Sequence, residues 1–252
     1  GGREERMERV AVVFPAYNEE RHVGEAADAA LGAGAGLVVC VDDCSEDRTG
    51  AIVQQLAEER DRVLAVHHLV NQGKQAAVKH GLQRALGRPG WEAVAVLDAD
   101  MQDDPALLPG MCHLAGPYDV VIGRRGRGQM PPVRRLANRL ANAPYRLLAR
   151  IPITDVQSGY RIYTRQVAQF LAENLAEEGG YTLEHTSMLL FGRLAAQRGR
   201  LFRIAEVDIP YSYGAAESSI TVRDNLQLTW AALYHAIALA RLRKRGTADD
   251  PA

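Results

Sequence analysis

The sequence predicts an α/β protein, built as a mostly parallel sheet flanked by helices. Short apolar runs rich in valine alternate along the first half of the chain with longer stretches of helical character. This alternation is typical of parallel strands joined by crossover helices, and uninterrupted apolar runs are typical of strands covered on both faces. Polar clusters follow three of the runs, at the edge where such sheets bind ligands.

Five apolar runs are predicted strands, at residues 9–14, 37–41, 62–68, 93–97 and 118–123. Three intervening stretches are predicted helices, at residues 19–33, 49–60 and 71–86. We expect the first strand to end at Pro15 and the third helix to be entered through Gly73. The order strand–helix–strand therefore predicts one sheet whose carboxyl edge carries the polar clusters "PAYNE", "DDCSED" and "DADMQDD".

A different pattern begins after residue 123. Residues 123–132 are rich in Gly, Pro and Arg and are predicted to form a loop. The next predicted elements are a helix, a short strand, a helix and a further strand of the same sheet, at residues 131–150, 161–164, 181–197 and 201–213. A long amphipathic helix with a basic end is predicted at 221–245, before a disordered tail at 246–252.

The composition is that of a soluble globular protein, with 252 residues, 47% of them hydrophobic and 24% charged. The formal net charge of −1 excludes the overall basicity of a nucleic-acid-binding protein. Three cysteines indicate neither a disulfide framework nor a zinc site, and are typical of reduced thiols in the cytoplasm. The sequence shows no secretory signal, and no apolar run approaches the roughly 18 residues of a spanning helix.

The stretch "VLDADMQDDP" places carboxylates directly after a predicted buried strand. Asp98 and Asp100 lie on one side of an extended backbone, where a hard divalent cation would relieve their repulsion. Gln102 continues the alternation and adds an amide oxygen, so the three residues suit a metal–diphosphate site. The alternative is a solvated acidic turn in which Asp103 or Asp104 caps the next helix, and we assign capping to both.

Two further clusters follow predicted strands. Asp42 or Asp43 could accept hydrogen bonds from a nucleobase or ribose, although either could equally cap the turn that follows. Asn71, Gly73 and Lys74 open a helix, where backbone amides and an ammonium group could bind an anion, and an ordinary helix start is the alternative.

Six motifs occur in a fixed order: "FPAYNEE", "VDDCSEDRT", "NQGKQAAVKHG", "VLDADMQDDP", "YDVVIGRR" and "DVQSGYRIYTRQV". On these motifs the chain resembles glycosyltransferase family 2, in the branch similar to dolichol- or polyprenol-phosphate mannose synthases, over about residues 10–220. The resemblance implies a GT-A fold, a nucleotide-sugar donor, Mg²⁺ or Mn²⁺, and inversion at the anomeric carbon. It implies a catalytic domain over 1–220, with a nucleotide-sugar part near 8–123 and an acceptor part near 124–220.

The resemblance also implies roles for individual residues of the donor site. Pro15, Tyr17 and Glu19 match the nucleotide-facing first loop, and Asp43 matches the acidic residue that recognises the nucleoside. The metal and diphosphate cluster of the family, "DADLQ", is matched by Asp98, Asp100 and Gln102.

On the acceptor side, Arg125 matches the arginine of a "GSR" motif in which Arg124 replaces the serine. Arg134 and Arg135 fall where the branch places arginines at the acceptor phosphate. The family's "D-x-x-S-G-x-R" stretch is matched by Asp155, Ser158, Gly159 and Arg161. One departure is that Ser219 or Ile220 stands where the branch has a lysine near its last strand, a position that Arg223 could replace.

Two acceptor classes stay open. A lipid phosphate, such as polyprenyl phosphate, is already anionic at pH 7, needs no strong base and suits the arginine-rich segment 124–139. A sugar or natural-product hydroxyl would need a carboxylate base, for which Asp155 and Glu184 are the candidates, whereas His185 is expected to be structural. A binding protein without catalysis is a third hypothesis, which the complete metal cluster disfavours.

The C-terminal helix at 221–245 could pack on the catalytic domain or a partner subunit, or could lie on a membrane surface. A lipid-phosphate enzyme needs some route to the bilayer. We therefore expect a cytoplasmic protein that could be peripheral at the inner face of the membrane.

Overall fold

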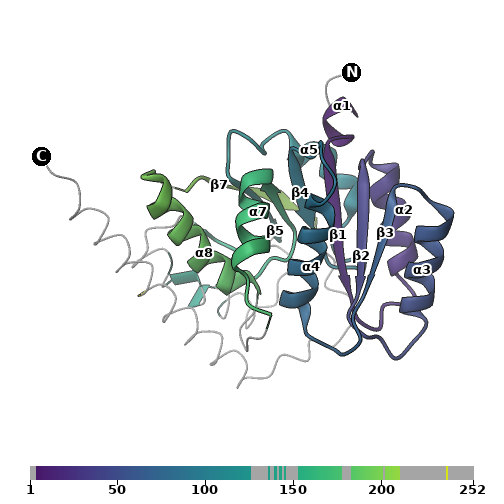
Figure 1. Ribbon diagram of the computed structural model, residues 1–252. Helices are drawn as coiled ribbons and strands as arrows, with labels where there is room; N and C mark the ends of the chain where they lie inside the picture. The colour runs from purple at the N-terminus through teal and green to yellow at the C-terminus, as the bar shows by residue number, and fades with distance from the viewer. Residues whose placement is uncertain are drawn as a thin grey trace, which may run out of the picture.

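The computed structural model describes residues 4–125, 153–177, 183–200 and 202–210, together with positions 136, 139, 140, 142, 143, 145 and 237. These residues form a single seven-stranded sheet between two layers of helices (Figure 1). The predicted loop at 123–132 begins too early, because residues 123–125 are the end of a strand that pairs with its neighbours in the sheet. The rest of that loop, Arg134, Arg135 and most of the C-terminal helix lie outside the described residues. The described positions within 136–145, and Ile237, are helical, in agreement with the two helices predicted there.

The strands of the sheet lie in the order β3-β2-β1-β4-β6-β5-β7. Their bounds are β1 (Val10–Ala16), β2 (Leu37–Asp42), β3 (Val63–His67), β4 (Ala93–Val96), β5 (Val120–Arg125), β6 (Arg161–Thr164) and β7 (Ile204–Ile209). All of the pairings are parallel except the two that β6 makes, with β4 and with β5. The prediction of a mostly parallel sheet is confirmed.

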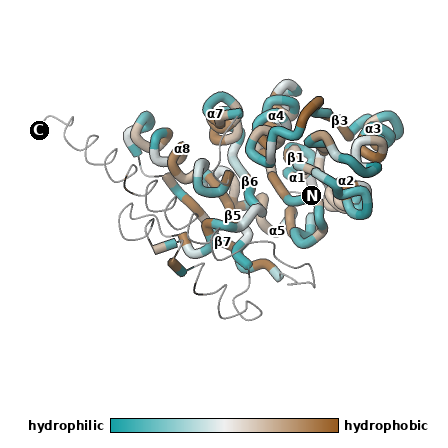
Figure 2. Tube along the Cα trace, turned by 90° about the horizontal axis from the view of Figure 1, so that it is seen from below, coloured by the Kyte–Doolittle hydropathy of each residue, from teal (hydrophilic) through white to brown (hydrophobic). Residues whose placement is uncertain are grey.

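Helices cover both faces of the sheet. One face carries α4 (Lys74–Leu86), α7 (Arg165–Asn174) and α8 (Leu183–Arg198), and the other carries α2 (Val23–Gly32), α3 (Thr49–Glu59) and α5 (Leu108–Cys112). Figure 2 shows the apolar strands running between these rows of helices. Two short elements, α1 (Glu4–Met7) and the 3₁₀ helix η1 (Pro105–Leu107), complete the described structure.

The apolar runs of the strands supply both halves of the core. Along β1, Ala11 and Val13 pack with α4, whereas Val10, Val12 and Phe14 pack with α2, because successive side chains point to opposite faces. Every one of these five side chains is buried. Burial on both faces explains why the strand sequence is apolar without alternation.

The structure corrects the end of the first strand. β1 continues through Pro15 to Ala16 and pairs there with β2 only. Val13 accepts a hydrogen bond from Leu97 on the β4 side, so Pro15, two residues further on, has its nitrogen on that same side. The pairing with β4 has ended by then, and the missing N–H of proline leaves no partner unsatisfied.

Two features were not predicted. The helix α7 follows the short strand β6 directly and packs between α4 and α8. The strand β6 itself was predicted, but its position in the middle of the sheet and its reversed direction were not.

We expect Gly81→Ala to destabilise the fold. Gly81 lies where α4 crosses the sheet, and a Cβ there would overlap the side chain of Val13 and come within 3.1 Å of Val41. Such overpacking should lower the free energy of unfolding by about 1–3 kcal/mol, measured by urea titration. Gly32→Ala is the control, since Gly32 ends α2 with no atom near its Cβ position. Equal stability of the two variants would contradict the close approach of α4.

Candidate functional site

A cleft of about 280 Å³ opens at the carboxyl ends of β1, β2 and β4, the lower edge of the sheet in Figure 1. Three strand ends and the start of α4 contribute its lining, which consists of Pro15, Ala16, Tyr17, Glu19, Asp43, Lys74, Ala77, Asp98, Ala99 and Asp100. Seven of these residues were candidates from the sequence. The structure therefore brings the donor-side candidates together in one place.

The two aspartates of the "DAD" motif lie in the cleft directly after β4. The backbone N–H of Gln102 donates to Asp100 at 3.0 Å, across a turn in which Met101 has a φ of 60°. Burial and the negative charge of Asp98 raise the pKa of Asp100, although the Gln102 N–H acts in the opposite direction. The charge of Asp98 thus disfavours the ionised form of Asp100, which is the electrostatic condition that a bound cation relieves.

The two following aspartates have different environments. Asp104 caps η1 by accepting a 2.8 Å hydrogen bond from the N–H of Ala106, so that prediction is confirmed. The prediction that Asp103 also serves as a cap is wrong, because its side chain turns into the protein and is 5% exposed. Burial and the charge of Asp98 raise the pKa of Asp103. Asp103 therefore belongs to the acidic cluster beneath the cleft.

The ammonium group of Lys74 joins two carboxylates. Its Nζ lies 2.7 Å from Asp98 Oδ1 and 3.1 Å from Glu184 Oε1. Burial alone would raise the pKa of Glu184, but the charges of Lys74 and Arg161 outweigh it and lower that pKa to about 2. The same two carboxylates raise the pKa of Lys74 against the effect of its own burial. Lys74 therefore links the cleft, where Asp98 lies, to the buried carboxylate of Glu184 in an ion triad.

Arg161 is almost completely buried and supports this triad from behind. Its guanidinium donates to the carbonyls of Ser158 and Val156, at 2.9 and 2.6 Å, and to Ser187 Oγ at 2.6 Å. Ser158 is buried as well, and its hydroxyl donates to the carbonyl of Gly123 at 2.5 Å. Both residues were candidates for ligand contact, and the structure instead places them where they hold the 153–160 loop against β5 and α8.

Gly159 lies where the 153–160 loop comes closest to Asp98 and Lys74. A Cβ at this position would be 2.8 Å from Asp98 Oδ2 and 3.2 Å from Lys74 Nζ. A side chain at this position would displace the ends of Asp98 and Lys74 from their present ion pair. The glycine of the "S-G-Y-R" stretch is thus explained by steric contact with the site.

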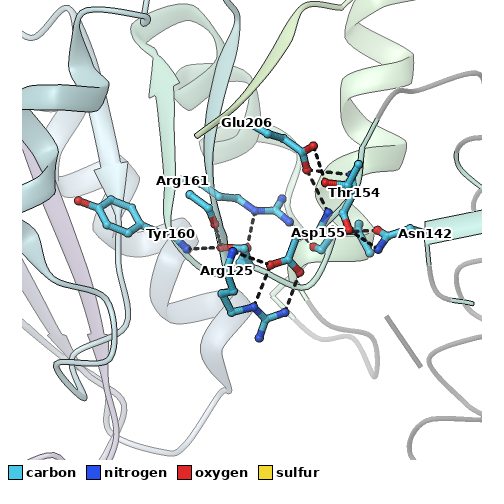
Figure 3. A network of polar contacts seen from close by, with 10 residues as sticks. Arg125, Asn142, Thr154, Asp155, Tyr160, Arg161 and Glu206 are labelled. Atoms are coloured by element: carbon cyan, nitrogen blue, oxygen red, sulfur yellow. Dashed lines mark hydrogen bonds and ion pairs between the residues drawn. The ribbon is translucent and has the colours of Figure 1, made fainter. Parts of the chain in front are cut away.

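On the far side of the loop, Arg125 binds Asp155 through two parallel contacts, Nε to Oδ2 at 2.9 Å and Nη2 to Oδ1 at 2.7 Å (Figure 3). The carboxylate also accepts the Arg125 backbone N–H at 3.1 Å. Glu206 accepts from the backbone N–H groups of Thr154 and Asp155, and Arg124 pairs with Asp208 of β7. Arg124, Arg125 and Asp155 therefore form one network that anchors the loop to the sheet.

The nucleoside-side candidates lie at the other end of the cleft. Asp43 is buried and accepts hydrogen bonds from the backbone N–H groups of Gln72 and Gly73 and from His68. Tyr17 is 43% exposed at the mouth. Burial raises the pKa of Glu19, as do the nearby charges of Asp100 and Asp98, although its hydrogen bond with His22 acts in the opposite direction.

Three structural facts could not be obtained from motif spacing. The bridge from Lys74 to Glu184 joins residues 110 positions apart. His68 was not a candidate, although "HH" next to a predicted strand end was a usable signal. His22 reaches Glu19 only because it lies at the start of α2.

Fold and cleft define an α/β protein that binds its ligand at the carboxyl edge of a mostly parallel sheet. Residues 11–171 match the sequence model of Glycosyl transferase family 2. This match covers more than half of the chain, and the chain belongs to that family.

Individual relatives agree with this assignment. An undecaprenyl-phosphate 4-deoxy-4-formamido-L-arabinose transferase from Pseudomonas aeruginosa (strain LESB58) is 33% identical over 171 residues, which is 65% of this chain and 49% of the relative. Glycosyltransferase AglD from Haloferax volcanii is 28% identical over 230 residues, 86% of this chain and 35% of the relative. The chain thus spans half or less of the length of these relatives.

Solved structures share the fold. Glucosyl-3-phosphoglycerate synthase from Mycobacterium tuberculosis, in complex with Mn²⁺ and UDP-glucose, superimposes with a TM-score of 0.64 at 17% identity over 96% of this chain and 83% of the other. The mannosyltransferase PcManGT from Pyrobaculum calidifontis, in complex with GDP-mannose and Mn²⁺, gives 0.55 at 18% identity over 97% and 76%. The predicted GT-A fold is therefore confirmed.

None of the helices in the described ranges is long and apolar enough to cross a membrane.

We expect Gly159→Ala to weaken cation binding with little effect on folding. The methyl group would displace the flexible ends of Asp98 and Lys74, so the free energy of unfolding should change by less than about 1 kcal/mol. Mn²⁺ affinity, measured by the electron paramagnetic resonance of the free ion in the presence of UDP, should fall about tenfold. Gly110→Ala in α5, where a Cβ meets no atom, is the matched control. Unchanged Mn²⁺ affinity in Gly159→Ala would refute the steric role of this glycine.

Removal of Lys74 should leave Glu184 poorly compensated. Lys74→Met should lower the free energy of unfolding by about 1–3 kcal/mol at pH 7. This loss is smaller than the loss expected for a fully buried ion pair, because Lys74 is partly exposed and Arg161 still acts on Glu184. The double variant Lys74→Met/Glu184→Gln should recover part of this loss in urea unfolding. Additive effects of the two substitutions would show that the ion pair is not coupled.

Proposed function

We propose that this chain is the catalytic domain of an inverting, metal-dependent glycosyltransferase that moves a sugar from a nucleotide-sugar to a polyprenyl phosphate. The observation that carries the proposal is the cleft in which Asp98 and Asp100 face Pro15, Tyr17 and Asp43 at the carboxyl edge of the sheet. Membership of glycosyl transferase family 2 supports the reaction type. The relative named as an undecaprenyl-phosphate transferase supports the acceptor class.

The chemistry of the cleft fits Mg²⁺ or Mn²⁺. Within the described ranges, no three His, Cys, Asp or Glu side chains are grouped so that they could hold a metal ion. Asp98 and Asp100 of the cleft would hold a hard cation together with donor phosphate oxygens, and the Gln102 amide is the third protein ligand expected from the sequence. When bound, such a cation neutralises charge on the leaving nucleoside diphosphate.

The environments of the two candidate bases favour a phosphate acceptor over a hydroxyl acceptor. Glu184 is paired with Lys74, and its pKa near 2 makes it a weak base. Asp155 is held by both guanidinium contacts of Arg125. A lipid phosphate needs no base, because an anionic oxygen can attack the anomeric carbon directly while the bond to the diphosphate breaks on the opposite face.

The acceptor side of the proposal rests on the basic segment. Arg124 and Arg125 end β5, and Arg125 contacts Asp155 in the 153–160 loop, whose Gly159 lies against Asp98 and Lys74. Arg134 and Arg135 follow in the same arginine-rich segment of the sequence. Guanidinium groups match phosphate oxygens in geometry and charge. We further propose that the protein works at the cytoplasmic face of a membrane, through its C-terminal helix at 221–245 or a partner subunit.

The variant Asp100→Ala should lose at least about a hundredfold in sugar transfer, because one of two carboxylates at the cation and diphosphate is removed. The assay supplies UDP- and GDP-sugars, Mn²⁺ and detergent-solubilised undecaprenyl phosphate, and follows sugar into the lipid phase. Asp104→Ala is the matched control: it removes a neighbouring carboxylate that only caps η1, and should cost about 1 kcal/mol of stability with activity retained.

Two outcomes would contradict the proposal. Transfer by Asp100→Ala at the wild-type rate would remove the acidic pair from the reaction. Sugar appearing only on soluble sugars or alcohols would replace the lipid phosphate by a hydroxyl acceptor, and Glu184→Gln and Asp155→Asn would then be compared to find the base.

A further inference from the structure

We infer that the donor carries a pyrimidinedione base, uracil or thymine, and not guanine, and that His68 is the residue that sets this specificity. The inference rests on the proposed function, in which the nucleoside lies at the Asp43 end of the cleft. The evidence for it is the number of hydrogen bonds that the Asp43 carboxylate can still accept from a ligand.

The structure occupies three of the accepting positions of Asp43. His68 Nδ1 lies 2.7 Å from Oδ1, and the backbone N–H of Gln72 donates to the same oxygen at 2.8 Å. The backbone N–H of Gly73 donates to Oδ2 at 2.7 Å. A carboxylate offers about four accepting positions, two on each oxygen. Among the described residues, Oδ1 is therefore saturated and one position on Oδ2 remains open, on a residue that lines the cleft.

A single open position distinguishes guanine from uracil and thymine. Guanine presents two adjacent donors, N1–H and the exocyclic amino group, and pairs with a carboxylate through both oxygens. Such pairing would require Oδ1 of Asp43 to accept a third hydrogen bond or to release His68 or Gln72. Uracil and thymine present one donor, N3–H, between two carbonyls, and one donor is what Oδ2 can still accept. A buried donor left without a partner is costly, so the mismatch discriminates against guanine.

His68 is fixed in its position on Oδ1 by a second histidine. His68 Nε2 lies 2.8 Å from His80 Nδ1, with the two rings nearly perpendicular. Because Asp43 only accepts, Nδ1 of His68 donates to it, and the other ring nitrogen of His68 shares a hydrogen bond with Nδ1 of a neutral His80. Burial and the proximity of His68 lower the pKa of His80, which favours this neutral form. The His68 side chain is buried, so water does not compete for its hydrogen bond with Asp43.

The adjacent histidine provides an internal control. His67 points to the other face of β3 and meets Asp42 at 3.4 Å, with 37% of its side chain exposed. The His67–Asp42 contact resembles the His68–Asp43 contact, but Asp42 does not line the cleft. Replacement of His67 therefore tests loss of a histidine at this strand end without any change at Asp43.

The experiment is titration calorimetry of UDP, dTDP and GDP binding to the full chain with saturating Mn²⁺. The wild type should bind UDP at least about tenfold more tightly than GDP, because guanine leaves one donor unpaired. His68→Ala opens a position on Oδ1 for the second donor of guanine, so GDP affinity should rise relative to UDP affinity and the UDP-to-GDP ratio should shrink to about threefold or less. His67→Ala should keep the wild-type ratio. The dTDP arm tests whether thymine, which presents the same single N3–H donor, is preferred over guanine as uracil is.

Several results would overturn the inference. GDP binding as tightly as UDP to the wild type would refute it and leave the glycosyltransferase proposal intact. An unchanged ratio in a folded His68→Ala would remove His68 from specificity. If His68→Ala does not fold, His80→Phe, which frees the His68 ring from its second contact, must lower the ratio for the inference to stand. If no nucleotide binds the wild type, both this inference and the proposed function fail.

Discussion

The ion triad centred on Lys74 is the interaction on which the arrangement of the site depends. Lys74 opens α4, Asp98 follows β4, and Glu184 lies in the first turn of α8. These three elements are far apart in sequence and meet at one ammonium group. A buried carboxylate such as Glu184 is tolerated only when it is paired, so the position of α8 and the position of Asp98 are electrostatically linked.

The reversed strand β6 makes this meeting possible. It runs antiparallel to β4, with Arg161 opposite Val96, so β6 begins at the edge where β4 ends. The 153–160 loop that precedes β6 is thereby delivered to the carboxyl edge of the sheet, where Gly159 touches Asp98 and Lys74. If β6 ran parallel to β4, the residues that follow β6, and not the 153–160 loop, would lie at the carboxyl edge of the sheet. The direction of one four-residue strand therefore decides which residues face the cleft.

Local patterns in the sequence were sufficient for the parallel strands and for the convergence of Asp43, Lys74, Asp98 and Asp100. The reason is physical: buried parallel strands need continuous apolar runs, and their carboxyl ends share one edge. The direction of β6 depends on pairing with β4 and β5, which no local pattern contains. The prediction that Asp103 caps a helix was also wrong, because burial of an aspartate depends on neighbours that fold against it. Arg161 and Ser158 have the polarity of ligand contacts, but their donors are used by the 153–160 loop, β5 and α8.

The electrostatics of the cleft have a consequence for the order of events. Glu19, Asp98 and Asp100 face the cavity with Lys74 as the one ammonium group in its described lining, and Lys74 is already paired. A surface of this sign attracts divalent cations and repels a free nucleoside diphosphate. In the proposed reaction, the nucleotide-sugar should therefore enter as its metal complex or after the cation. High salt should slow the arrival of the cation more than it weakens the assembled complex.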